Sequence, residues 1–435
     1  MSQPDYRSKP HNPKWRRRLL LGGALAGAAG LFMRPNEHGA AHNSYFALMT
    51  QALKEAGIAS PTLIIDKTRL LANQEVVRKH LAAKKMALRL VAKSLPSFPL
   101  LDFFMQGLQT KRLMLFNLPY LQLAAQQRAD SDILLGKPLP VAAAAQFYRE
   151  FKTGQFLPEK QLQWLVDSPA RMAQYRDLAR NMQLNLRINL EIDVGLHRGG
   201  FADQASMQAA LEILKSEPRL QYAGMMGYDA HISKIPDILG AQGNALAFAK
   251  QQYQQFAAQA KAALGDLPNL TMNTAGSPTY RLHDGSGSAN ELAIGSAFVK
   301  PSDFDTDLLQ ELQPACFITT PVLKAGQAFQ MPRGVEFLGD LARTWDRNSQ
   351  QAYFVYGGNW LADPVSPAGL TASSLYGTSS NQQILQGSGL QKLQVDDMVF
   401  FRPRQSEAVL QQFGAIAVYE IGRISERWEV FPAQA

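Results

Sequence analysis

Short apolar runs alternate with amphipathic stretches along most of this chain. Eight runs rich in Leu, Ile, Val and Met are predicted to be β-strands, at residues 87–92, 112–116, 132–135, 163–166, 184–192, 222–228, 269–273 and 291–294. Apolar residues at helical spacing lie between them, at 68–83, 142–151, 170–182, 205–215 and 245–263. Eight strands that alternate with helices predict a (β/α)8 barrel, whose active site lies at the carboxyl ends of the strands.

The pattern changes after about residue 301, where short strands and turns follow one another. Strands are predicted at 317–323, 351–356, 397–401, 415–421 and 428–431, separated by Gly- and Ser-rich stretches such as 373–389. An apolar run at 62–66 precedes the first helix and is a candidate to join these strands. We therefore predict the α/β class, with a linker and strand at 42–66, a (β/α)8 barrel at 67–303 and a β-rich C-terminal domain at 304–435.

Composition excludes several classes of protein. The chain has 435 residues, of which 46% are hydrophobic and 18% charged, which is too apolar for a disordered protein. Residues 1–41 contain seven Lys or Arg and two acidic residues, so they account for +5 of the net charge of +8. A basic face for nucleic acid is therefore not expected. The single cysteine, Cys316, excludes an intramolecular disulfide and lies in a segment predicted to be a buried strand.

The first 41 residues have the features of an export signal or an N-terminal membrane anchor. Six basic residues precede 15 uncharged residues at 19–33, a run shorter than the roughly 20 residues that a membrane span needs. Arg16 and Arg17 resemble the pair in a twin-arginine signal, which exports folded proteins from the bacterial cytoplasm. We predict a periplasmic protein, or one anchored in the inner membrane and facing the periplasm. The general secretory route and a cytoplasmic location stay open as alternatives.

A lysine marks the end of the first predicted barrel strand. Lys93 follows the apolar run at 87–92 directly. A lysine whose ammonium group is desolvated there can lose its proton and form a Schiff base at neutral pH. The alternative is a lysine that reaches solvent at the strand tip.

Other polar residues follow later strands, and each has an ordinary structural explanation when taken alone. They are an arginine among glycines, a tyrosine, a histidine and a small-residue turn: Arg198, Tyr228, His231, Thr274, Gly276 and Ser277. A turn of small residues after the seventh strand can cradle a phosphate, as barrels often do at this place. Because these residues follow successive strand ends, together with Lys93 they indicate one site.

Several segments, in their order along the chain, resemble motifs of one enzyme family. They are Arg89-Leu90-Val91-Ala92-Lys93, Asp193-Val194-Gly195 with Arg198, Tyr228 with His231, Gly276-Ser277-Pro278-Thr279-Tyr280, and Gly295-Ser296. They are similar to motifs of pyridoxal-phosphate enzymes with the alanine-racemase-like barrel (fold type III), specifically the branch of D-threonine aldolase and D-serine dehydratase. The resemblance implies pyridoxal 5'-phosphate as cofactor and a small-molecule amino acid as substrate. It also implies a homodimer, because such relatives build their sites between two protomers.

The resemblance also implies a role for each residue. Lys93 would hold the cofactor and then move the α-proton of the substrate, and His231 would be a second acid or base. Cofactor-binding residues would be Lys93 itself, Arg198, Tyr228, Thr274, Gly276, Ser277 and Gly295.

One departure from the family bears on the reaction. Aldolases and dehydratases of this branch hold a divalent metal through a late Pro-x-His-x-Cys/Asp segment, where this chain has Gln405 and Glu407. An amide oxygen is a poor ligand for zinc or manganese, so no metal ligand is assigned and a metal-independent protein is predicted. Arg402 or Arg404 is a candidate to bind a substrate carboxylate.

The function that the resemblance favours is a D-threonine aldolase or D-serine dehydratase-like lyase. The alternatives are a metal-independent racemase and a non-catalytic barrel that binds pyridoxal phosphate.

Overall fold

A computed structural model describes residues 34–152, 154–373 and 375–432. Most of the predicted export segment at 1–41 therefore lies outside the described residues. Within the described ranges, no helix is long and apolar enough to cross a membrane. The described residues form two compact units: one contains residues 48–319, 360–363 and 401–432, and the other contains residues 34–47, 320–359 and 364–400, with the gaps given above. We call them the barrel unit and the β unit.

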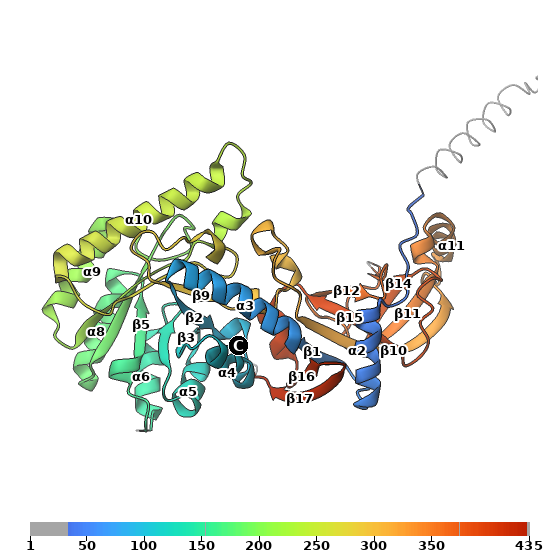
Figure 1. Cartoon of the computed structure of the whole chain (residues 1–435), viewed down its shortest axis with the longest axis horizontal. Helices are drawn as coiled ribbons and strands as arrows, with labels where there is room; N and C mark the ends of the chain where they lie inside the picture. The colour runs from blue at the N-terminus through green and yellow to red at the C-terminus, as the bar shows by residue number, and fades with distance from the viewer. Residues whose placement is uncertain (1–33, 153, 374, 433–435) are drawn as a thin grey trace, which may run out of the picture. The chain divides into compact units, whose positions relative to one another are not determined.

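The barrel unit contains a closed barrel of eight parallel strands, which confirms the predicted fold (Figure 1). In chain order the strands are β2 (Ala87–Val91), β3 (Arg112–Leu115), β4 (Asp132–Leu135), β5 (Leu162–Val166), β6 (Leu186–Ile192), β7 (Leu220–Gly227), β8 (Thr271–Thr274) and β9 (Glu291–Ile294). Each strand pairs with the next, and β2 pairs with β9 to close the ring. All eight predicted strands are present, with bounds shifted by at most two residues.

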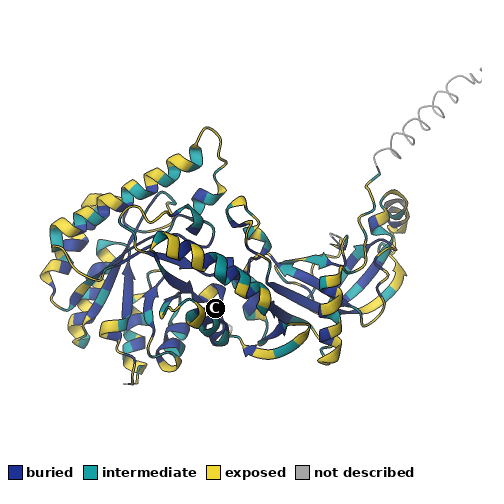
Figure 2. Cartoon of the chain, in the orientation of Figure 1, coloured by how far each residue is buried: buried dark blue, intermediate teal, exposed yellow. Residues whose placement is uncertain are grey.

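Helices surround this barrel, and five of them were predicted. The helices are α3 (Lys67–Lys84), α4 (Phe98–Gly107), α5 (Leu118–Gln127), α6 (Val141–Glu150), α7 (Pro158–Gln161), α8 (Pro169–Met182), α9 (Gln204–Ser216) and α10 (Ala241–Leu264). In Figure 2 the barrel strands are buried, whereas the outward faces of α8, α9 and α10 are exposed. The predicted set lacked α4, α5 and the short α7. In α4 most of the ten positions are apolar, so no helical periodicity marks it.

Local sequence signals fix where several of these helices begin. Asn117, Ser168 and Asp203 are N-caps, and each side chain accepts a hydrogen bond from the backbone N–H of the third residue of the helix that follows. Proline occupies the first turn of α5 and of α8, where its missing N–H group leaves no bond unmade. Strand ends and helix starts are therefore held at fixed places around the barrel.

The predicted strand at 62–66 is present and joins further strands of the barrel unit. It is β1 (Thr62–Asp66), which pairs antiparallel with β10 (Cys316–Ala328) and parallel with β16 (Ala415–Glu420). Cys316 is buried at the start of β10, as predicted, and burial raises the pKa of its thiol. β16 also pairs with β17 (Arg423–Glu429), so the strand predicted at 428–431 begins earlier than expected.

The β unit is built on an antiparallel sheet. From Thr320 onward β10 pairs with β11 (Gln351–Tyr356), and β11 pairs with β14 (Gln382–Gly387), which pairs with the short β13 (Thr371–Ala372). The stretch at 373–389 was predicted to be a separator, and this is wrong, because β14 lies in it. Burial alternates along β14, so its Gln residues fit a half-buried strand.

The remaining elements are short or link the units along the chain. They are α2 (Ser44–Glu55), α11 (Glu336–Trp345), β12 (Ala362–Ser366), β15 (Met398–Pro403) and α12 (Ser406–Val409). β12 pairs with β15. The segment at 42–66, expected to contain a linker and a strand, also contains α2, where Met49, Ala52 and Leu53 are buried.

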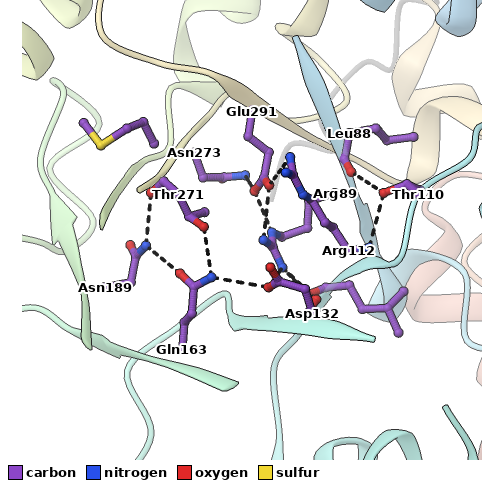
Figure 3. Close-up of polar contacts among 12 residues, drawn as sticks. Leu88, Arg89, Thr110, Arg112, Asp132, Gln163, Asn189, Thr271, Asn273 and Glu291 are labelled. Atoms are coloured by element: carbon purple, nitrogen blue, oxygen red, sulfur yellow. Dashed lines mark hydrogen bonds and ion pairs between the residues drawn. The ribbon is translucent and has the colours of Figure 1, made fainter. Parts of the chain in front are cut away.

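A buried ion pair joins the first and last strands of the barrel (Figure 3). Arg89 in β2 is fully buried, and its guanidinium donates to both carboxylate oxygens of Glu291 in β9, at 2.6 and 3.1 Å. It also donates to the backbone and carboxylate oxygens of Asp132, at 2.9 and 3.1 Å. Asn273 donates to Glu291 at 2.8 Å. The sequence pattern did not reveal this network.

Neutral side chains extend the network to two more strands, β5 and β6, beginning with Gln163, which donates to the Asp132 carboxylate at 3.3 Å (Figure 3). Gln163 donates to the Thr271 hydroxyl at 2.9 Å, and the Asn189 side chain donates to Oε1 of Gln163 at 3.1 Å. The interior of the barrel is therefore polar as well as tightly filled. Because Asn273 also lines the cavity described next, the network reaches the floor of that cavity.

Candidate active site

An open cavity lies at the carboxyl ends of the barrel strands, where barrel enzymes have their active sites. It is lined by residues that follow seven of the strands and by one residue of α12, among them Lys93, Ser94, Phe116, Arg198, Tyr228, Gly276, Ser277, Ser296 and Glu407. Five of the residues singled out from the sequence are thus brought together: Lys93, Arg198, Tyr228, Gly276 and Ser277.

Lys93 lies in a short 3-10 turn, η1 (Ala92–Ser94), directly after β2. Its Nζ is 3.6 Å from a carboxylate oxygen of Glu407 and 4.8 Å from the centroid of the Phe116 ring. Of the two alternatives for Lys93, the structure favours a lysine that reaches solvent at the strand tip, because 45% of its side chain is exposed. A carboxylate and an aromatic face, rather than an apolar pocket, surround this amine.

The turn after β6 carries Arg198 to the cavity. Gly200 in this turn has φ of +95°, and a Cβ there would lie 2.7 Å from the backbone carbon of Ile192, so only glycine fits. The guanidinium carbon of Arg198 lies 4.5 Å from the centroid of the Tyr228 ring. Burial raises the pKa of Tyr228, although the nearby Arg198 opposes this. Arg198 and Tyr228 thus form a cation–π pair at the cavity wall.

The small-residue turn after β8 is fixed by two close contacts. The Ser277 hydroxyl oxygen accepts hydrogen bonds from the backbone N–H groups of Gly295 and Ala297, at 2.9 and 3.1 Å. A Cβ on Gly276 would lie 2.6 Å from the Tyr228 ring, so glycine allows the turn to reach that ring. A hydroxyl that accepts two N–H groups still carries its own hydrogen, which can be donated to a ligand oxygen.

The buried carboxylate of Asp229 is hydrogen-bonded to this turn. Asp229 accepts hydrogen bonds from the Thr279 hydroxyl at 2.5 Å and from Nε2 of His283 at 2.7 Å. The Thr279 hydroxyl oxygen in turn accepts from the backbone N–H of Gly276 at 3.3 Å. Asp229 therefore positions the turn without lining the cavity itself.

Three of the predicted site residues do not line the cavity. Thr274 faces a second, smaller cavity, which it shares with His283. Gly295 packs against the lysine turn, since a Cβ there would lie 2.8 Å from Cβ of Ser94 and of Val91. His231 lies in η2 (Ala230–Lys234), and its buried Nδ1 has no hydrogen-bond partner among the described residues. Their roles stay predictions.

The segment before and within α12 makes contacts that the sequence did not indicate. Gln405 donates its amide to Asp303 at 3.1 Å, and Arg404 pairs with the same carboxylate at 3.2 Å. Arg402 pairs with Asp305 at 2.6 Å, and neither arginine lines the cavity. Glu407, in contrast, enters the cavity and contacts Lys93. No group of three or more His, Cys, Asp and Glu side chains placed to hold a metal is found in the part of the chain that the structure describes.

A second carboxyl group beside the site, that of Glu191, has a raised pKa. Glu191, at the end of β6, lines a small cavity together with Arg198 and Tyr228. It is 8% exposed, and burial raises its pKa to about 7, with the charge of Asp167 adding to the shift and Arg198 opposing it. Glu191 thus stays protonated to a higher pH in the folded protein than in the unfolded chain.

Glu191→Gln is expected to remove part of the pH dependence of stability. The raised pKa favours folding below pH 4.5, and this contribution is lost as the pH rises through about 7, so the wild type should lose about 3 kcal/mol more than the variant over that window. Urea unfolding of both proteins at several pH values measures the difference. Glu212→Gln, on the exposed face of α9, is the control, and identical pH profiles for Glu191→Gln and wild type would contradict the prediction.

The residues around the cavity fit pyridoxal phosphate. The cofactor needs an amine for its aldehyde, donors for its phosphate and a partner for its ring. Lys93 supplies the amine, the turn at Gly276 and Ser277 supplies a hydroxyl and backbone donors, and Arg198 supplies a positive charge in the same lining. The cavity therefore contains groups suited to the aldehyde, the phosphate and the ring of this cofactor.

Comparisons with known proteins identify the family and the fold. The family model of the alanine racemase N-terminal domain matches residues 65–303. D-threonine aldolase from Filomicrobium marinum is 16% identical, with a TM-score of 0.65 over 85% of this chain and 96% of its own. D-threo-3-hydroxyaspartate dehydratase from Delftia sp. HT23 is 17% identical, with a TM-score of 0.64 over 87% of this chain and 98% of its own.

A racemase has the same fold. Alanine racemase of Clostridium difficile 630 is 12% identical, with a TM-score of 0.61 over 85% of this chain and 98% of its own. No curated protein sequence matches the chain. Because the family match covers more than half of the sequence, this chain belongs to the alanine racemase N-terminal domain family of pyridoxal-phosphate-dependent barrel enzymes.

Proposed function

We propose that this protein is a lyase that acts on a D-amino acid bearing a β-hydroxyl group, with aldolase or dehydratase chemistry. The observation that carries the proposal is Lys93, placed after the first barrel strand in a cavity that also holds Arg198, Ser277 and Glu407. Two of the similar solved structures are named D-threonine aldolase and D-threo-3-hydroxyaspartate dehydratase, and they resemble this chain over nearly their whole length. This likeness supports the choice of substrate class.

Each residue that lines the cavity would have a separate role in this reaction. When bound, pyridoxal phosphate supplies an electron sink for the bond that breaks at the substrate's α-carbon. Lys93 holds the cofactor through Nζ and, once displaced by the substrate amine, moves the proton at the α-carbon. Gly276 and Ser277 bind the phosphate, while Arg198, held over the Tyr228 ring, orients the cofactor.

Racemisation is the second candidate, and one observation favours it. The two positions at which the similar lyases hold a metal are engaged elsewhere, since Gln405 binds Asp303 and Glu407 contacts Lys93. Racemisation requires proton transfer on two faces of the α-carbon and no metal. It therefore does not depend on a metal ligand at either of these positions.

A panel of D- and L-amino acids distinguishes the candidates. The purified, cofactor-loaded protein is incubated with both enantiomers of threonine, serine, 3-hydroxyaspartate and alanine. Glycine with an aldehyde identifies an aldolase, a keto acid with ammonia identifies a dehydratase, and the opposite enantiomer identifies a racemase. A bound chromophore without any product would overturn the proposal and indicate a carrier of the cofactor.

Activity is expected to survive removal of divalent metals. Gln405 offers only a neutral amide, which is a poor ligand for zinc or manganese, and one carboxylate cannot supply the three protein ligands of a catalytic zinc site. Turnover is measured before and after dialysis against EDTA, together with elemental analysis of the purified protein. Stoichiometric zinc or manganese in the purified protein, with activity that is lost on chelation and restored by the metal, would contradict this prediction.

A further inference from the structure

Glu407 is held in place by three serine hydroxyl groups at the edge of the cavity. Ser94 donates to Oε1 at 2.8 Å, and Ser406 donates to Oε2 at 3.2 Å. The Ser296 hydroxyl lies 3.4 Å from Oε2 and 3.0 Å from the Ser406 hydroxyl. These serines come from η1, from the turn after β9 and from α12, so three separate segments fix one carboxylate.

The same carboxylate is open to the cavity and close to the reactive amine. One third of the Glu407 side chain is exposed, and Oε1 lies 3.6 Å from Nζ of Lys93. Hydroxyl donors fix the direction in which this carboxylate points. Glu407 is therefore oriented and within reach of Nζ of Lys93, which is the geometry that a general acid–base needs.

We propose that Glu407 is a catalytic residue that carries the proton exchanged when Nζ of Lys93 bonds to an aldehyde carbon. The Lys93 ammonium gives one proton to Glu407, and the neutral Nζ attacks the carbon to form the C–N bond. The aldehyde oxygen then receives one proton from the nitrogen and one from Glu407. The C–O bond breaks, water leaves, and the nitrogen lone pair completes the C=N bond, so Glu407 ends as it began. The inference rests on the proposed use of Lys93 to hold the cofactor.

Two probes test this step without measuring turnover of an amino acid. The first is the rate at which cofactor-free protein captures pyridoxal phosphate, followed by the absorbance of the adduct. The second is trapping of acetaldehyde on Lys93 by cyanoborohydride, quantified by peptide mass spectrometry. In Glu407→Gln, which keeps the size of the side chain, both rates should fall about 100-fold, as expected for loss of a general acid–base. The exposed Glu212→Gln is the matched control and should react as fast as wild type.

Chemical rescue separates proton transfer from a structural role. Glu407→Ala should be as slow as Glu407→Gln, and added formate should restore its rate in proportion to formate concentration, because a free carboxylate can occupy the vacated space. A structural role alone gives no formate dependence. Capture rates in Glu407→Gln within about threefold of wild type, or no formate effect in Glu407→Ala, overturn the inference, and so does a wild type whose Lys93 captures neither probe.

These outcomes are independent of the amino-acid panel. Normal capture in wild type, slow capture in Glu407→Gln and no turnover of any amino acid would overturn the proposed function and leave the role of Glu407 in place. Turnover of a D-amino acid together with unchanged capture in Glu407→Gln would support the proposed function and overturn the role of Glu407.

Discussion

Replacement of Lys93 with alanine is expected to abolish the covalent adduct that borohydride reduces and to lower turnover by a factor of roughly 10³ or more. Lys93 provides the amine that lines the cavity beside Glu407 and Phe116, directly after β2. Without it, the cofactor has no covalent link to the chain and the α-proton has no acceptor at this position. Reduction with borohydride followed by peptide mass spectrometry measures the first effect, and the amino-acid panel measures the second.

Lys67→Ala is the control for this experiment. Lys67 begins α3 and contacts Glu420 and Glu426, at 3.3 and 2.9 Å, so it is committed to ion pairs away from the cavity. The control should retain both the adduct and the activity. An adduct that persists in Lys93→Ala, or that maps to Lys67, Lys84 or Lys85, would show that the cofactor lysine has been assigned incorrectly.

Glu291→Gln should cause the largest loss of stability among single substitutions in the barrel. The change leaves the fully buried guanidinium of Arg89 without its bidentate partner, and breaking a buried ion pair in this way costs about 3 to 5 kcal/mol. The free energy of unfolding in urea measures this effect. If the variant does not accumulate as folded protein, its soluble yield reports the same loss.

Two further variants keep this prediction testable. Arg89→Met combined with Glu291→Leu removes both charges and should be more stable than Glu291→Gln, because no unpaired charge stays buried. Asp130→Asn breaks the exposed pair with Lys111, whose side chains are 60% and 68% exposed, and should change stability by about 0.5 kcal/mol or less. Equal effects of Glu291→Gln and Asp130→Asn would contradict the importance given to burial.

The sequence predicted the barrel well because its signal is local. Strands such as β4 and β9 have the predicted bounds, since each is a short apolar run between polar turns. Helices with a clear polar face, such as α8, were also predicted. α4 was not, because its apolar residues leave no polar face, and β14 was not, because its Gln residues resemble a loop.

The site was predicted only in the part that lies next to strand ends. Lys93, Arg198 and Tyr228 could be placed because each directly follows a recognisable strand or turn. Glu407 is 314 residues from Lys93 in the sequence, and no pattern in one dimension indicates that α12 meets η1. Arg89 and Glu291 are charged residues of opposite sign in two apolar strands, and the sequence shows this. It does not show that they pair, because pairing them requires knowing that β2 and β9 are neighbours.

The ion pair between Arg89 and Glu291 can form only after the ribosome has synthesised β9, the last strand of the barrel. Arg89 and Glu291 are separated by 202 residues, which a ribosome working at 5 to 20 residues per second adds in roughly 10 to 40 s. During that interval the emerging β2 lacks the carboxylate that accepts two of its guanidinium hydrogen bonds, so burying this strand early is unfavourable. We therefore expect the first strands to stay hydrated on the nascent chain, and the interior to become dry only after β9 has been synthesised.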